Sequence, residues 1–204
     1  TKTRTLSSDL QKHGDLISGT FDIFNALWKE LQLGKILVKL CPKENRDYNP
    51  ERAIFAMVLH RLTDPDSRRD CHRFIGTVYD QELAQLKLHQ LYRAMDRLYP
   101  AIKEIEQNLF VNRMDLFNQE VTLALYDMTT CTVWGKGSDD LLKHGPSKSK
   151  RSDKKQYKLG LLVDQTGFPI GHDVWSGNYA EIKTLIPALN SLKERFQLKQ
   201  VAMV

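Results

Sequence analysis

Cysteine is scarce in this sequence, and its spacing excludes two common kinds of structural site. The chain has 204 residues and only three cysteines, Cys41, Cys71 and Cys131. An odd number of cysteines without C-x-x-C spacing indicates neither a disulfide framework nor a zinc site. Three reduced thiols are typical of a cytoplasmic protein, and we expect that location.

Long apolar runs are missing as well. The longest, residues 53–59, is far shorter than the roughly 20 residues that a membrane-spanning helix needs, and there is no secretory signal. We therefore expect no membrane partner. The chain begins with Thr1 rather than Met, from which we expect a processed protein or a fragment.

Positive charge is present but confined to one stretch. Residues 143–158 hold seven Lys or Arg and one acid, whereas the rest of the chain holds 23 basic and 24 acidic residues. A block of this kind is either a solvated loop or an electrostatic footprint for the phosphates of a nucleic acid. Charge alone does not decide between the two.

The first half of the chain has the pattern of helices. Apolar residues recur at helical spacing over 21–40, with Gly34 as the expected stop or break. Asn49 and Pro50 are typical of an N-cap and the first helical position. They predict a helix that continues through Leu62.

Two more helices are expected before the pattern changes. One covers residues 80–98, and Pro100 opens another that reaches about Asn118. The sequence therefore predicts an all-helical region over residues 1–118 that could engage DNA.

Near residue 120 the pattern changes to that of strands. Three segments are rich in β-branched, aromatic and leucine residues. Asp164 to Gly167 form a turn of the hairpin type between the second and the third. The three predicted strands cover residues 121–133, 157–164 and 168–177.

A crossover helix and a fourth strand complete the expected order β-β-β-α-β over residues 119–204. Asn178 and Glu181 form a capping-box pattern, and an apolar stripe continues to Phe196. Residues 200–204 predict a last strand that returns parallel to an earlier one. The predicted class is α+β, and a chain ending on a sheet strand leads us to expect truncation.

Particular motifs in this second region resemble a known family. "LYDMTT", followed by "HGPSKSKRSDKKQYKLGLLVDQTGFPIGHDVWSGNYAEIKTL", is similar to the DDE transposases of bacterial insertion sequences, in the IS-four-type superfamily with an RNase H-like core. The earlier "HRLTDPDS" and "LYRAMDRL" resemble the helical region before that core. The resemblance covers about residue 50 to the end, and implies that residues 119–204 are the first half of an RNase H-like mixed sheet.

The resemblance implies a catalytic and metal-binding role for Asp127. In the family, three acids bind two divalent metal ions, Mg²⁺ or Mn²⁺, and the first acid stands in a D-x-T setting that Asp127 and Thr129 match. The second acid is expected one or two positions after Val204, and the third much further on. The 204 residues would then carry one of the three catalytic acids. Whether they catalyse the reaction by themselves stays open.

The chemistry explains why carboxylates are needed. Two metal ions about 3.5–4 Å apart activate the nucleophile and stabilise the leaving oxygen when a phosphodiester is opened. Mg²⁺ prefers hard oxygen ligands. Strand alternation places Asp127 on the same face as Leu123, Leu125 and Thr129. The alternative is a surface acid that ends a strand.

The resemblance favours DNA as the partner of the basic block. Contacts between lysine or arginine and phosphates position DNA without reading its sequence. A solvated insertion loop remains the alternative. The predicted DNA-binding residues are Lys148, Lys150, Arg151, Lys154, Lys155 and Lys158.

The intact parent of such a chain would cut transposon ends and join them to target DNA, with two protomers on paired ends. Two other functions compete with this one. The first is a non-catalytic DNA-binding remnant, and the second is a protein-interaction module.

Four further features have structural interpretations. Trp134 and Trp175 are packing candidates, although Trp134 beside a basic loop could stack on a base. Asp164 is most simply a turn residue. His172 is expected at the surface or in the core rather than as a ligand, and Asp139 with Asp140 in a solvated loop.

Overall fold

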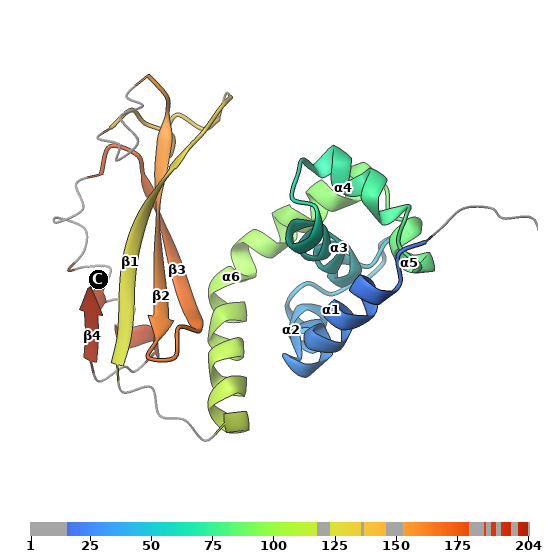
Figure 1. Cartoon of the computed structure of the whole chain (residues 1–204), viewed down its shortest axis with the longest axis horizontal. Helices are drawn as coiled ribbons and strands as arrows, with labels where there is room; N and C mark the ends of the chain where they lie inside the picture. The colour runs from blue at the N-terminus through green and yellow to red at the C-terminus, as the bar shows by residue number, and fades with distance from the viewer. Residues whose placement is uncertain are drawn as a thin grey trace, which may run out of the picture. The chain divides into compact units, whose positions relative to one another are not determined.

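Helices come first in the chain and strands follow (Figure 1), which confirms the predicted α+β class. The computed structural model describes residues 16–117, 123–135, 137–145, 153–179, 186, 189–190, 193–196 and 200–203. The chain divides into two compact units, Thr1–Ala101 and Ile102–Val204. The division falls inside a long helix, earlier than the expected boundary after residue 118, so the last turns of that helix belong with the strands.

The helices lie near their expected positions, but several of their boundaries differ from the prediction. Asn49 caps α3 as predicted, and its Oδ1 accepts a hydrogen bond from the Glu51 amide at 3.1 Å. The helices span α1 Gly19–Glu30, α2 Leu33–Leu40, α3 Pro50–Thr63, α4 Arg68–Ile75, α5 Gln81–Ala84 and α6 Leu88–Phe117.

The break within residues 21–40 comes earlier than Gly34. Gln32 adopts a φ of 54° and separates α1 from α2. Gly34 instead lies in the first turn of α2, where an added Cβ would be 3.3 Å from Oε1 of Glu51. The glycine is therefore needed for close packing against α3 and not for ending a helix.

The expected helix start at Pro100 is wrong. Pro100 lies inside α6, which continues because one missing backbone donor interrupts one hydrogen bond and leaves the turns on either side intact. Asp80 caps the short helix α5, accepting a bond from the Leu83 amide at 2.8 Å. The segment 80–98 is therefore two helices and not one.

Aromatic and aliphatic side chains form the core of the first unit. The ring centroids of Trp28 and Phe55 lie 5.1 Å apart, and those of Phe21 and Phe55 lie 5.8 Å apart, both in edge arrangements. Cys41 and Cys71 are buried free thiols, and burial raises the pKa of each. Both thiols are therefore protonated and shielded.

The four strands form one sheet in the order β3-β2-β1-β4. The β1–β2 and β2–β3 pairs are antiparallel, and β4 pairs parallel with β1, as the sequence predicts. In Figure 1, β1 lies between β2 and β4. The strands span β1 Leu123–Thr132, β2 Gln156–Asp164, β3 Pro169–Ser176 and β4 Gln200–Met203.

The turn between β2 and β3 confirms the interpretation of Asp164. Its Oδ1 accepts bonds from the amides of Thr166 at 2.8 Å and Phe168 at 2.9 Å. Burial opposes ionisation of Asp164, but these bonds and the guanidinium of Arg113 outweigh it, so its pKa is lowered. Gly167 supplies the positive φ of 83°.

One face of the sheet carries the core of the second unit. Tyr126 is fully buried there, and the rings of Phe110 in α6 and Phe196 meet over it with centroids 5.1 Å apart. Gly160 makes room for Tyr126, because an added Cβ would lie 1.8 Å from the tyrosine hydroxyl. The core residues are Ala124, Tyr126, Leu162, Ile170 and Phe196, with Phe110, Met128 and Leu189 partly buried against them.

Candidate functional site

Asp127 lies on β1, on the face of the sheet that points away from this core. Its neighbours in the strand, Tyr126 and Met128, face the core, while Asp127 itself is exposed. The Met128 amide donates to Asp127 Oδ1 at 2.8 Å. A carboxylate on an interior strand is thus presented to solvent on a rigid element.

The register of β4 indicates which part of that strand lies nearest to Asp127. Leu125 pairs with Ala202 and Tyr126 with Met203. The described part of this pairing therefore stops one residue before Asp127. The predicted position of a second acid, after Val204, lies outside the described residues.

Asp127 suits a hard metal ion as one oxygen ligand, because carboxylates are what Mg²⁺ and Mn²⁺ prefer. Within the residues that the structure describes, no group of three or more His, Cys, Asp or Glu side chains could hold a metal ion. Asp127 therefore fits as one member of a set, and the described part of the chain holds no complete one.

The structure describes three of the six predicted DNA-binding residues. Lys148, Lys150 and Arg151 lie outside the described residues. Lys154 lies 3.8 Å from Asp153, and Lys155 pairs with Asp139. These two lysines stand at the end of the sheet, just before β2.

Lys158 lies within β2, where Thr130 and Trp175 are its partners in the neighbouring strands. It is only 3% exposed. Its ammonium is therefore placed for a contact inside the protein rather than for a DNA phosphate at the surface.

A pocket of about 610 Å³ opens at this end of the sheet. Trp134 lines it and is 70% exposed, so the expected packing role is wrong for this tryptophan. Asp139 is held by Lys155, whose hydrogen bond lowers the pKa of the carboxyl. The lining residues are Val133, Trp134, Gly135, Gly137, Asp139, His144, Asp153, Lys154 and Lys155.

Backbone bonds fix the place where the basic stretch leaves and rejoins the sheet. The Lys143 amide donates to the Gln156 carbonyl at 3.2 Å, and the Gln156 amide donates to the Lys143 carbonyl at 2.9 Å. Gly177 packs directly against this bridge, since an added Cβ would lie 2.0 Å from the Gln156 carbonyl oxygen. His144 and Lys155, the neighbours of the two bridged residues, line the pocket.

A charged cluster beside the edge strand β3 was not predicted from the sequence. Glu106 of α6 accepts bonds from both the amide and Nδ1 of His172, at 3.0 and 2.5 Å, and it also pairs with Arg195. The hydrogen bond with Glu106 raises the pKa of His172. Burial raises the pKa of the adjacent Asp173. The cluster ties α6 to β3 and to the segment 193–196.

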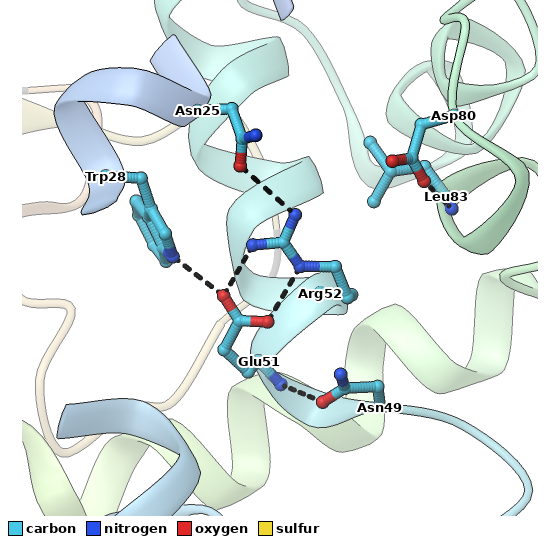
Figure 2. Close-up of polar contacts among 7 residues, drawn as sticks. All are labelled: Asn25, Trp28, Asn49, Glu51, Arg52, Asp80 and Leu83. Carbon is cyan, nitrogen blue, oxygen red and sulfur yellow. Dashed lines mark hydrogen bonds and ion pairs between the residues drawn. The ribbon is translucent and has the colours of Figure 1, made fainter. Parts of the chain in front are cut away.

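A second polar cluster lies in the helical unit, and Figure 2 shows its contacts. Buried Glu51 accepts a bond from Trp28 Nε1 at 2.7 Å and two more from Arg52, each at 2.7 Å. Arg52 also reaches Asn25 at 3.4 Å. Because these groups satisfy one another, the cluster fixes α1 against α3 and offers little to a ligand.

No family model matches the chain, and no curated protein or solved structure matches it either. Among the helices in the described part of the chain, none combines the length and the apolar character needed to cross a bilayer.

Proposed function

We propose that this chain is part of a DDE-type DNA transposase with an RNase H-like sheet. In this proposal Asp127 is a catalytic residue that ligates a divalent metal ion, Mg²⁺ or Mn²⁺, and the basic stretch that includes Lys154 and Lys155 contacts the DNA backbone. Bound metal would supply activation of the nucleophile and stabilisation of the leaving oxygen. Transposon ends and target DNA are the proposed substrates, with two protomers acting together.

The observation that carries the proposal is the position of Asp127. Its carboxylate is exposed on the interior strand β1, on the face opposite the core. β4 pairs with the residues of β1 that directly precede Asp127. The strand order β3-β2-β1-β4, with two antiparallel pairs and one parallel pair, supports the same interpretation. The sequence resemblance supplies the family, and the described geometry is compatible with it.

Binding of Mn²⁺ tests the role of Asp127. This paramagnetic ion broadens the NMR signals of amides near its site, even when one carboxylate binds it weakly. We expect preferential broadening at Met128 and its neighbours on β1. Asp127→Asn should abolish this broadening, since the amide is a poorer ligand than a carboxylate for a hard cation.

Asp140→Asn is the matched control, because Asp140 is an exposed acid in a loop away from β1. It should leave the broadening on β1 unchanged. Equal broadening in the wild-type protein and Asp127→Asn, or none in either, would contradict a metal-ligating role for Asp127.

A non-catalytic DNA-binding protein is the second candidate. The absence of a complete ligand set among the described residues favours it. Mg²⁺-dependent cleavage of DNA by the chain would exclude this candidate, whereas salt-sensitive DNA binding without cleavage would favour it.

A further inference from the structure

We propose that the pocket beside Trp134 receives a single unpaired nucleobase of bound DNA. The inference rests on the proposed function, because DNA must first be held by the chain. It adds a site seven residues along the chain from Asp127, beyond the end of β1 at Thr132.

Trp134 combines exposure with a position in the wall of a pocket. Its side chain is 70% exposed, so its ring is open to a partner. It stands in the wall of a pocket of about 610 Å³, within the range of about 300–1,000 Å³ that small-molecule sites occupy. A base stacks on such a ring regardless of its sequence, since every base has a π-face.

The lining of the pocket is balanced in charge. Two lysines contribute to it, but Lys155 pairs with Asp139, and Lys154 lies 3.8 Å from Asp153. These four groups give the pocket no net charge, which suits a neutral ring inside it. Both ion pairs are partly exposed and therefore weak, so the two lysines are able to exchange them for DNA phosphates at the rim.

The lining also offers hydrogen-bond acceptors. Asp139 and Asp153 carry carboxylate oxygens that can accept bonds from ring N–H and amino groups of a base. These groups are free in an unpaired base and occupied in a duplex. The lining therefore favours a base outside the double helix.

The pocket lies next to the basic stretch of the chain. The pocket sits at the base of the stretch 143–158, which holds seven Lys or Arg and one acid. Such a block draws the phosphates of a strand toward it. A base next to those phosphates comes within reach of Trp134.

The test compares two DNA molecules of equal length, a blunt duplex and a duplex with a short single-stranded overhang, by fluorescence anisotropy. We expect the wild-type chain to prefer the overhang. Trp134→Ala should weaken overhang binding by about 5- to 100-fold, and should leave blunt-duplex binding unchanged. Trp134→Phe keeps a stacking ring and should retain most of the preference.

Tyr99→Ala is the matched control, because Tyr99 is also an exposed aromatic residue, at 79%, and lies in α6 outside the pocket. It should bind both molecules as the wild-type chain does. A second readout is indole emission, which stacking quenches. Quenching by a short single strand should occur in the wild-type protein and be lost in Trp134→Phe.

The outcomes separate the two proposals. If the blunt duplex binds with salt dependence, but Trp134→Ala changes neither the preference nor the quenching, the pocket inference is overturned and the proposed function stands. If only the short single strand binds and quenches Trp134, the pocket stands and the transposase proposal fails. If neither DNA binds, both are overturned.

Discussion

At the scale of single residues, the tightest fit in the second unit is between Gly160 and Tyr126. Tyr126 on β1 is fully buried and crosses over Gly160 on β2. Any side chain at position 160 would occupy the place of the tyrosine ring. The glycine in "YKLGLLVD" is therefore a packing requirement, which the strand pattern of the sequence did not reveal.

We expect Gly160→Ala to destabilise the second unit by about 1–3 kcal/mol, because the added methyl would lie 1.8 Å from the Tyr126 hydroxyl in a packed core. The free energy of unfolding in urea measures the loss. Gly19→Ala is the control, since nothing lies within 4 Å of its added Cβ. An unchanged free energy of unfolding in Gly160→Ala would show that Tyr126 moves aside without cost.

At the scale of elements, Glu106 connects α6, β3 and the segment 193–196. His172 gains a hydrogen bond from this contact, which raises its pKa above the ordinary 6.5. Asp173, whose pKa is raised by burial, and Lys103 face the same cluster. A raised folded-state pKa means that the folded protein holds the proton more tightly than the unfolded chain does.

The stabilisation from His172 should therefore be complete below about pH 6.5 and lost as the pH rises through the folded-state pKa. Asp173 has the same sign, because its raised pKa also favours the protonated folded state. Urea unfolding at several pH values from about 5.5 to 8.5 measures this trend. His172→Gln, which can donate a bond but does not titrate, should flatten the profile; the same slope in both proteins would rule out His172 as its cause.

The elements also show what sequence reasoning can and cannot supply. Strand period predicted 121–133 where β1 covers Leu123–Thr132, and it predicted the parallel return of β4. These features depend on neighbouring residues and on general rules of chain connection. The bond between Glu106 and Arg195 joins positions that are 89 residues apart in the sequence. No local sequence pattern predicts such a pair.

Some features of the candidate site could likewise be predicted from the sequence, and others could not. The strand that carries Asp127 and the residues with which it shares a face follow from alternation along β1. The exposure of Asp127 does not follow, because apolar Leu125 shares that face. Burial of Lys158 does not follow from its basic neighbours, because it depends on side chains from β1 and β3. The exposure of Trp134 was missed for a similar reason, since tryptophan is usually a packing residue and only the position past the end of β1 leaves it open.

At the scale of the whole molecule, the chain has two separate cores. One gathers around Phe55 in the helical unit, and the other around Tyr126 on the sheet. The division between Ala101 and Ile102 follows directly after Pro100 in α6. A helix is weakened at a proline because the ring removes one backbone donor.

We therefore expect two transitions in calorimetry rather than one. Phe55→Leu should lower only the transition of the helical unit, and Gly160→Ala only that of the sheet unit. For units of this size, each kcal/mol lost shifts a midpoint by about 4–8 °C. A single transition that both variants shift equally would show that the two cores unfold together.

The paired backbone bonds between Lys143 and Gln156 bear on how such a chain can evolve. The stretch between these two positions begins and ends at this one pair of backbone-bonded residues. We expect insertions, deletions and substitutions at residues 144–154 to leave the register of β1 and β2 unchanged. That register is set by the pairs from Thr132 and Gln156 to Ala124 and Asp164, and by the bond from the Val133 amide to the Lys155 carbonyl. The surface offered to a partner is then free to diversify while the sheet that carries Asp127 keeps its pairing.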